Sequence, residues 1–312
     1  MVTAEPRPVP SAVPRTPDDV PGWFWPLDQQ LFSWMLERQR QRGTGGDLLE
    51  LGSYLGRSAI LMGRHLQSGE TFTICDLFDS EAPDGENDAE MTMSYRESLT
   101  RSAFERNYLA FHPELPVIVQ APTSVLADGR VPAESCRFVH IDASHLYEHV
   151  AGDIRIARTV LGKGGIVVLD DYRSEHTPGV AAATWEAVFS QGLRPICVTP
   201  EKLYGTWEDP EPLQQELLLL DGEGEHRLLE VDIIAGQRVI RFSERSIATL
   251  LPAEPARAQT QAAPAAAAPA PARAVRPRSA VRRLALDLLP PVATRAVRRG
   301  LQSARDRAAG RN

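Results

Sequence analysis

The sequence has few cysteines and no long apolar segment. Its three cysteines, Cys75, Cys136 and Cys197, are widely spaced and form no CxxC pair. This number and spacing argue against a disulfide framework and a zinc ribbon, and they favour a reducing compartment. No stretch approaches the roughly 20 apolar residues that a membrane-spanning helix needs. The Pro-rich start, MVTAEPRPVPSAVPRTPDDVPG, lacks the apolar core of a signal peptide. We therefore expect a cytoplasmic protein.

Acidic charge is scarce at the C-terminal end of the chain and abundant before it. Residues 255–312 hold twelve arginines, no lysine and two acids, Asp287 and Asp306, so their net charge is +10. Because the whole chain carries −7, residues 1–254 carry −17. An acidic body argues against nucleic acid as the main ligand, since binding to phosphates needs a basic surface.

Strand and helix patterns alternate through the middle of the chain. Short apolar strand patterns, among them DLLELG, TFTICDLF, RFVHIDA and GGIVVLDD, are separated by helical segments. This alternation predicts an α/β fold with a parallel sheet that helices cover on both faces. Later strand patterns within 194–207 and 225–244 indicate an antiparallel edge.

These patterns divide the chain into four regions. We expect a disordered N-terminus over 1–21, one α/β domain over 22–250, an Ala/Pro-rich linker over 251–277 and a basic amphipathic tail over 278–312. Basic amphipathic helices bind anionic membrane surfaces or acidic partners. A weakly helical tail without such a role is one alternative, and docking of the tail on the acidic body is another. The acidic stretch 79–93 is either a lid over a ligand or a solvated loop.

Ligands of doubly wound sheets bind beyond the carboxyl ends of the strands, which makes the residues after each strand the candidates. The first strand runs into ELGSYLGRS, residues 50–58, whose glycines permit a tight turn and a close approach of a ligand. The segment lacks the GxGxxG fingerprint of dinucleotide-binding proteins, because Glu50 replaces the first glycine and the second spacing is longer. At the end of the second strand, Asp76 can accept hydrogen bonds from both hydroxyls of a ribose.

Four segments together resemble the class I S-adenosylmethionine-dependent methyltransferases, in the branch of the bacterial sugar O-methyltransferases of the macrocin and mycinamicin type. They are ELGSYLGRS, the second strand with Asp76, HIDASHLYEHVAGDI and GKGGIVVLDDY, within a likeness that covers residues 20–245. The resemblance implies a Rossmann-like doubly wound, mostly parallel seven-stranded sheet with an antiparallel edge, and S-adenosylmethionine as cofactor. The predicted cofactor-binding residues are Glu50, Gly52, Ser53, Tyr54, Gly56, Ser58, Asp76, Gln120, Ser124 and Asp142.

Three carboxylates follow the fourth and fifth strands. Asp142 ends one strand, and Asp170 and Asp171 end the next. In the order of the resembled fold these strands are neighbours, so the carboxylates would repel each other unless a cation lay among them. The resemblance implies a divalent ion, Mg²⁺ or Mn²⁺, bound by all three, which would chelate vicinal hydroxyls of the substrate. Because successive strand residues point to opposite faces, Asp170 and Asp171 can share one ion only if the chain turns there.

Two histidines follow Asp142. His145 is the predicted general base, because a neutral imidazole can take the proton of a hydroxyl as its oxygen attacks a methyl group. The Asp-x-x-His spacing is similar to that of the mycinamicin-type enzyme, whereas other relatives have an acidic base at the position of Ser144. We expect a structural or surface role for His149, since HLYEH is not the HExxH of zinc proteases. The aromatic segment GWFWP, residues 22–26, is either a lid or core, with core favoured slightly.

The sequence therefore predicts an S-adenosylmethionine-dependent O-methyltransferase that acts, with a divalent metal, on a hydroxyl of a sugar, a glycoside or another vicinal diol. Such a reaction would modify a natural product or a glycan. One alternative is a nicotinamide-dependent oxidoreductase, which the missing GxGxxG disfavours. Another is a non-catalytic, methyltransferase-like module that binds a membrane or a partner through its tail. A homo-oligomer is compatible with the sequence.

Overall fold

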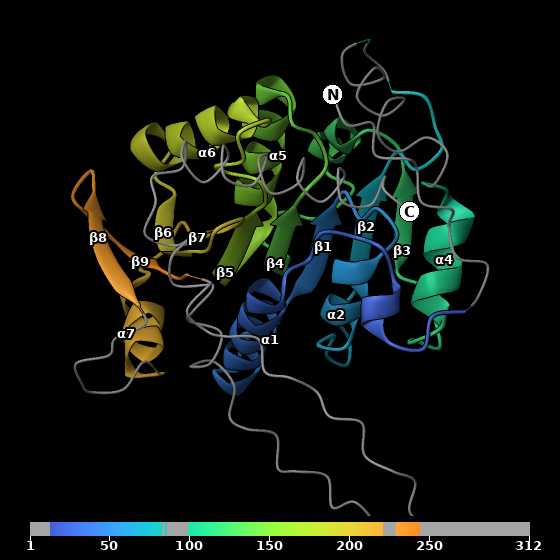
Figure 1. Ribbon diagram of the computed structural model, residues 1–312, viewed down its shortest axis with the longest axis horizontal. Coiled ribbons are helices and arrows are strands. Elements are labelled where there is room, and N and C mark those ends of the chain that lie inside the picture. Colours follow the sequence, from blue (N-terminus) through green and yellow to red (C-terminus); the bar gives the residue numbers. More distant parts are fainter. Residues whose placement is uncertain (1–12, 83–84, 86–98, 221–228, 244–312) are drawn as a thin grey trace, which may run out of the picture. The chain divides into compact units, whose positions relative to one another are not determined.

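Nine strands form one sheet in the computed structural model, which describes residues 13–82, 85, 99–220 and 229–243. The strands are β1 (Asp47–Leu51), β2 (Phe72–Asp76), β3 (Val117–Gln120), β4 (Cys136–Ile141), β5 (Leu161–Leu169), β6 (Arg194–Val198), β7 (Leu203–Thr206), β8 (Glu230–Ile234) and β9 (Gln237–Arg241). Their order is β3-β2-β1-β4-β5-β7-β6-β9-β8 (Figure 1). The five strands from β3 to β5 are parallel, and β7 is antiparallel to both of its neighbours.

This sheet confirms the predicted α/β, mostly parallel fold with an antiparallel edge. Its first seven strands, from β3 to β6, are those of the prediction. The hairpin of β8 and β9 adds two more, because β9 pairs in parallel with β6 through Cys197 and Ile240. The predicted count of seven strands is therefore two short.

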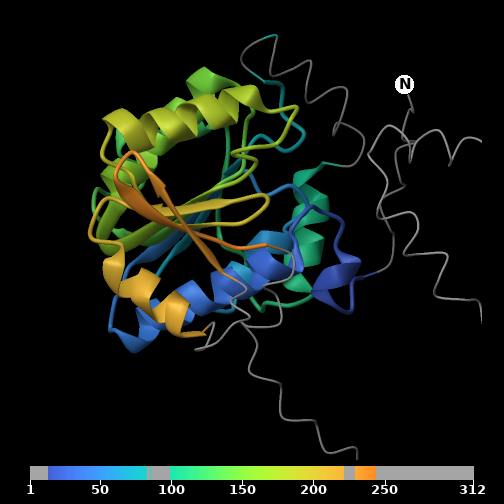
Figure 2. The same ribbon diagram turned by 60° about the vertical axis from the view of Figure 1, so that its left-hand side comes forward.

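Helices cover both faces of the sheet (Figure 2). The helices α1 (Pro26–Gln41), α2 (Arg57–Gly63), α4 (Arg101–Leu109) and α7 (Glu211–Leu220) share one apolar cluster with one face. The helices α5 (Tyr147–Val160) and α6 (Pro178–Ser190) and the 3-10 helix η2 (Thr123–Asp128) share the other. Each strand contributes alternate residues to the two clusters, as Leu48 and Leu49 do in β1. Burial on both faces explains why these strands are apolar throughout.

The register of the sheet brings four strand ends together. Leu51 at the end of β1 pairs with Cys75 of β2 and with Ile141 of β4, and Ile141 pairs with Leu169 of β5. The residues that follow these positions therefore lie side by side at the carboxyl edge of the sheet, where parallel α/β sheets bind their ligands.

A buried ion pair stabilises the sheet at the amino ends of its parallel strands, opposite the carboxyl edge. Arg137 in β4 is fully buried, and its Nε and Nη2 donate to the two carboxylate oxygens of Glu70, both at 2.8 Å. Its Nη1 also donates to Gln39 Oε1 at 3.2 Å, and its Nη2 donates to the carbonyl oxygen of His65 at 2.8 Å. Such a pair tolerates burial because both charges are neutralised and hydrogen-bonded.

The N-terminal segment is ordered earlier than the sequence predicted. Residues Pro17–Asp19 form the 3-10 helix η1, and Asp19 accepts hydrogen bonds from the backbone of Arg15 and Thr16. Val20 is 1% exposed, and Asp18 forms an ion pair with Arg57 of α2. Order therefore begins before residue 22, because an apolar side chain and a charge are both anchored to the domain.

Several predicted regions lie outside the described residues. They are the linker 251–277, the basic tail 278–312, the first twelve residues and most of the stretch 79–93. Among the residues that the structure does describe, no helix is long and apolar enough to cross a membrane.

Candidate active site

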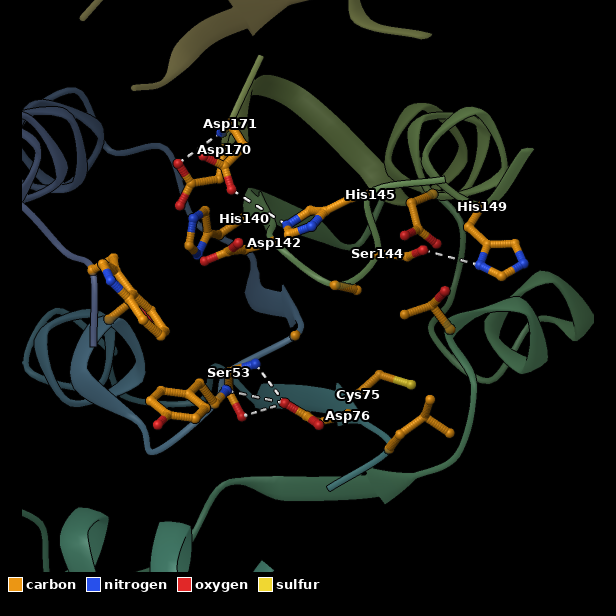
Figure 3. Close-up of a pocket in the computed structure, with 18 of the residues that line it drawn as sticks. Ser53, Cys75, Asp76, His140, Asp142, Ser144, His145, His149, Asp170 and Asp171 are labelled. Carbon is orange, nitrogen blue, oxygen red and sulfur yellow. Dashed lines mark hydrogen bonds and ion pairs between the residues drawn. The ribbon is translucent and has the colours of Figure 1, made fainter. Parts of the chain in front are cut away.

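A cavity of about 640 Å³ opens at the carboxyl ends of β1, β2, β4 and β5. The predicted site residues that line it are Gly52, Ser53, Tyr54, Ser58, Asp76, Ser124, Asp142, His145, Asp170 and Asp171. Figure 3 shows its two sides, with Ser53 and Asp76 on one and the histidines and the other carboxylates on the other. The register of the sheet thus brings together residues that are more than a hundred positions apart in the sequence.

The turn after β1 approaches the end of β4 so closely that it requires glycine. Gly52 has a φ of +79°, and a Cβ at this position would lie 2.1 Å from the carbonyl oxygen of Asp142. Tyr54 also has a positive φ, of 49°. A side chain at position 52 would collide with backbone and adopt a conformation that L-residues rarely adopt. The turn therefore exposes its backbone to the cavity, as the sequence predicted.

Asp76 holds this turn in place. Its Oδ2 accepts hydrogen bonds from the backbone N–H of Ser53 at 2.6 Å, from the Ser53 hydroxyl at 3.1 Å and from the N–H of Tyr54 at 3.1 Å. Its Oδ1 accepts from the N–H of Phe78 at 2.7 Å. Burial raises the pKa of Asp76 above its usual value, although these hydrogen bonds oppose the shift. The carboxylate is 7% exposed and lines the cavity, so it can also face a ligand.

Three predicted cofactor residues do not line the cavity. Glu50 is fully buried beneath it, because its side chain points to the α1 face of the sheet, where its Oε1 lies 2.8 Å from His140 Nδ1. Burial raises the pKa of Glu50 to about 8. Gly56 begins α2 and lies against the ring of Phe104, and Gln120 donates to Asp79 and Ser80 near the surface. Their direct contact with the cofactor therefore stays a prediction, because none of the three lines the cavity.

Two of the three carboxylates after β4 and β5, Asp142 and Asp170, lie close together, and His140 joins them. His140, Asp142 and Asp170 each offer a ligand atom, and these atoms lie within 4.8 Å of one another. Asp171 lies outside this group. It follows Asp170 directly and has a φ of 54°, and its side chain points to His145 instead (Figure 3). The chain turns at this point, but the turn separates the two carboxylates instead of joining them.

Lys202 lies beside this group. Its Nζ forms an ion pair with Asp170 Oδ2 and lies 3.3 Å from His140 Nε2. Burial and the charge of Asp170 raise the pKa of Asp142 well above its usual value. A divalent ion bound by the same groups would meet an ammonium of its own sign, so the residues present do not fit the predicted metal.

His145 is paired with Asp171. Its Nε2 lies 3.3 Å from Asp171 Oδ2, and its side chain is 22% exposed where it lines the cavity. The hydroxyl of Ser174 donates to Asp171 Oδ1 at 2.6 Å. Burial alone would raise the pKa of Asp171, but the hydrogen bonds from His145 and Ser174 bring this pKa below its usual value. A carboxylate that orients an imidazole at a cavity wall is the arrangement of a supported general base.

Comparison with known families identifies this region. A family model described as a methyltransferase domain matches residues 49–172, less than half of the chain. This segment is similar to a methyltransferase domain. The match begins in β1 and ends just beyond β5, so it includes the turn after β1, Asp76, the carboxylates and His145. It agrees with the methyltransferase family that the sequence predicts.

Solved structures give more distant likenesses to the methyltransferase domain. The O-methyltransferase NovP is 18% identical, over 58% of this chain and 79% of that chain, with a TM-score of 0.48. The calicheamicin methyltransferase CalS11 is 18% identical, over 60% of this chain and 82% of that chain, with a TM-score of 0.44. An O-methyltransferase from Bacillus cereus in complex with SAH is 15% identical, over 61% and 85%, with a TM-score of 0.40. No curated protein matches the sequence.

The aromatic segment before α1 divides between core and cavity. Phe24 is 5% exposed and packs against Phe32, with ring centroids 4.9 Å apart. Trp23 and Trp25 are 63% and 51% exposed and line the cavity of the methyltransferase domain, where the ring of Trp23 lies 5.4 Å from that of Tyr54. The sequence favoured core for the segment, which holds for Phe24 alone.

Three residues of the site carried no separate signal in the sequence. His140 belongs to a strand pattern, although it shares a face with Asp142 two positions later. Lys202 is a single charge in a loop between late strands. Asp153 of α5 lines the cavity, and its Oδ2 makes no hydrogen bond within the described residues. Burial raises the pKa of Asp153 to about 7. His149 also lines the cavity, and its Nδ1 lies 3.1 Å from the hydroxyl of Ser144.

Proposed function

We propose that this protein transfers a methyl group from S-adenosylmethionine to a hydroxyl of a sugar or another vicinal diol. The observation that carries the proposal is the placement of His145, supported by Asp171, in the same cavity as the turn that Asp76 holds. One side of the cavity thus suits the methyl donor, and the other side offers a base to the acceptor.

The donor side consists of the turn after β1 and Asp76. S-adenosylmethionine, when bound, supplies a methyl group that is activated by its sulfonium charge. The backbone between Gly52 and Tyr54 gives the donor a close approach to the sheet edge, and the carboxylate of Asp76 is available to the ribose hydroxyls. Asp153 and Ser124 extend the same wall. Together these groups would hold the methyl donor on this side of the cavity.

On the acceptor side, His145 takes the proton of the reacting hydroxyl. When bound, S-adenosylmethionine would give its methyl group to the hydroxyl oxygen and keep the electron pair of the broken carbon–sulfur bond on sulfur. The proton moves to the imidazole as the oxygen loses electron density. Asp171, 3.3 Å from Nε2, stabilises the positive charge that then develops on the ring. General-base catalysis of this kind contributes roughly a hundred- to ten-thousandfold in rate.

The surroundings of His145 favour an acceptor with many hydroxyl groups. Asp142, Asp171 and Ser174 line this side and can accept or donate hydrogen bonds. The exposed rings of Trp23 and Trp25 add apolar surface at the same cavity. Polar groups that fix orientation beside aromatic surface suit a molecule with polar edges and apolar faces, such as a sugar ring. The divalent metal predicted from the sequence has no part in the proposal, because Lys202 lies among its ligands.

The test is isotope transfer from methyl-labelled S-adenosylmethionine to a panel of acceptors. The panel holds free sugars, nucleotide-linked sugars, small-molecule glycosides and catechol, which is a planar vicinal diol. We expect a labelled sugar ether, and a loss of about a hundredfold or more in turnover in His145→Ala with binding of S-adenosylhomocysteine retained. His65→Ala is the matched control, because His65 lies at the other edge of the sheet near Arg137.

Each outcome bears on a different part of the proposal. Label on catechol but on no sugar would overturn the acceptor class. Full turnover in His145→Ala would overturn the assignment of the base. If S-adenosylhomocysteine does not raise the melting temperature of the protein but NAD⁺ does, methyl transfer itself is wrong and a nicotinamide enzyme is favoured.

A further inference from the structure

The chain contains only two lysines among its 34 basic residues. Lys163 is exposed, whereas Lys202 is 1% exposed and lies in the loop that leads into β7. Burial of an unpaired ammonium is very costly, so a fully buried lysine needs compensating negative charge. The carboxylates of Asp28, Asp142 and Asp170 supply that charge.

The loop fixes Lys202 in position. Its backbone N–H donates to the hydroxyl of Thr199 at 2.8 Å, and its carbonyl accepts from the N–H of Thr199 at 2.9 Å. The ammonium lies 5.7 Å from the centre of the Phe24 ring, which covers it from the side of α1. The backbone thus delivers the side chain to one place, and the apolar cover excludes water from it.

The groups that face the ammonium are acids and one imidazole. Asp170 pairs with it directly, and His140 Nε2 lies 3.3 Å away as an acceptor. Asp28 and Asp142 add further negative charge near the ammonium, and both favour its charged form.

We propose that the ammonium of Lys202 is the resident cation of the group formed by His140, Asp142 and Asp170, in the place where a divalent ion is bound in the enzymes that the sequence resembles. The protein then neither binds a divalent ion at this group nor needs one for turnover. The part that concerns turnover rests on the proposed function, whereas the part that concerns binding does not.

Lys202 acts as a positioning residue, because its own side chain is too buried to contact an acceptor freely. It neutralises Asp170, which in turn allows Asp142 to lie beside that carboxylate at the cavity wall. A fixed single charge organises these groups without offering the open coordination positions that a metal would give to two vicinal hydroxyls. The acceptor is then oriented by hydrogen bonds, with His145 alone responsible for its proton.

The test measures Mn²⁺ binding by electron paramagnetic resonance on metal-free protein, with no cofactor or acceptor present. We expect the wild type to bind no Mn²⁺ at this group. Asp170→Asn should therefore leave any Mn²⁺ signal of the protein unchanged. Lys202→Met keeps the length of the side chain and removes its charge, which leaves the three ligands without a cation. This variant should therefore bind Mn²⁺ at least about tenfold more tightly than the wild type. Lys163→Met changes the other, exposed lysine and should behave as the wild type does.

Two results would overturn the proposal. One is a Mn²⁺ signal in the wild type that Asp170→Asn abolishes, since the ion would then bind despite the lysine. The other is a folded Lys202→Met that binds Mn²⁺ no better than the wild type. If Lys202→Met does not fold, the Mn²⁺ measurement on the wild type still tests the proposal. Lys202→Arg is then the second variant, because it keeps the charge and should remain folded and free of Mn²⁺ at this group.

Turnover gives the second readout. With any acceptor that the wild type methylates, the initial rate should be the same in EDTA as in added Mg²⁺, and a loss of activity in EDTA that Mg²⁺ restores would refute the inference. Failure to methylate any acceptor would count against the proposed function alone, because Mn²⁺ binding is measured independently of turnover.

Discussion

Replacement of Asp153 with asparagine should stabilise the protein relative to the wild type, and this gain should be larger at neutral and alkaline pH than at acidic pH. Asp153 lies on α5, is 1% exposed, and its Oδ2 has no hydrogen-bond partner within the described residues. Asparagine has nearly the same shape but cannot ionise. The variant therefore removes the cost of the buried charge and little else.

The magnitude follows from the pKa of this carboxyl group. Burial raises this pKa from 3.8 to about 7. Each pH unit between the two values costs about 1.4 kcal/mol of unfolding free energy. The sign is fixed by the direction of the shift: below pH 4 both states are protonated, and stability is lost as the pH rises toward 7. The full loss approaches about 4 kcal/mol, of which about 2.5 kcal/mol falls between about pH 5 and about pH 8.

Urea denaturation of the cofactor-free protein, followed by tryptophan fluorescence, measures this difference. The unfolding free energies of Asp153→Asn and of the wild type are compared at the two pH values. Asp209→Asn serves as the control, because the side chain of Asp209 is 59% exposed and should show almost no pH-dependent difference. If the difference in unfolding free energy between Asp153→Asn and the wild type is the same at both pH values, burial does not raise the pKa of this carboxyl group, and the prediction is wrong.

Two further substitutions test the opposite edges of the sheet. Gly52→Ala should abolish binding of S-adenosylhomocysteine in calorimetry and lower the melting temperature, because its Cβ would lie 2.1 Å from the carbonyl oxygen of Asp142; retained binding would contradict the described turn. Arg137→Met should lower the unfolding free energy by roughly 3 to 5 kcal/mol, since it leaves the Glu70 carboxylate without its partner. A loss below about 1 kcal/mol would show that this pair contributes little.

The order of strands and helices could be predicted because burial on both faces makes a parallel strand apolar throughout, as in DLLEL of β1. The same argument located Asp76, Asp142 and Asp170, since Asp76 ends such a strand and the other two each follow one directly. The two strands of the final hairpin were recognised as late strands, but their union with β6 depends on pairing between distant residues, which no local pattern specifies.

The directions of the side chains could not be predicted in the same way. Glu50 faces away from the cavity because of its place in the pleat, and it meets His140 because the register pairs these two residues across β1 and β4. Asp171 pairs with His145 because the backbone turns left-handed at that residue. Lys202 reaches the carboxylates through the order of β5 and β7 in the sheet, which a lone lysine in a loop does not reveal.

Lys202 offers a criterion for sorting related sequences by their need for an ion. A relative that keeps His140, Asp142 and Asp170 but has a neutral residue in place of Lys202 has lost its internal countercharge and should require a metal. A relative that keeps the lysine should not. Because Lys202 lies 32 residues beyond Asp170 and outside the matched segment 49–172, surveys confined to that segment would group the two kinds together. Alignments that extend through β7 would separate them.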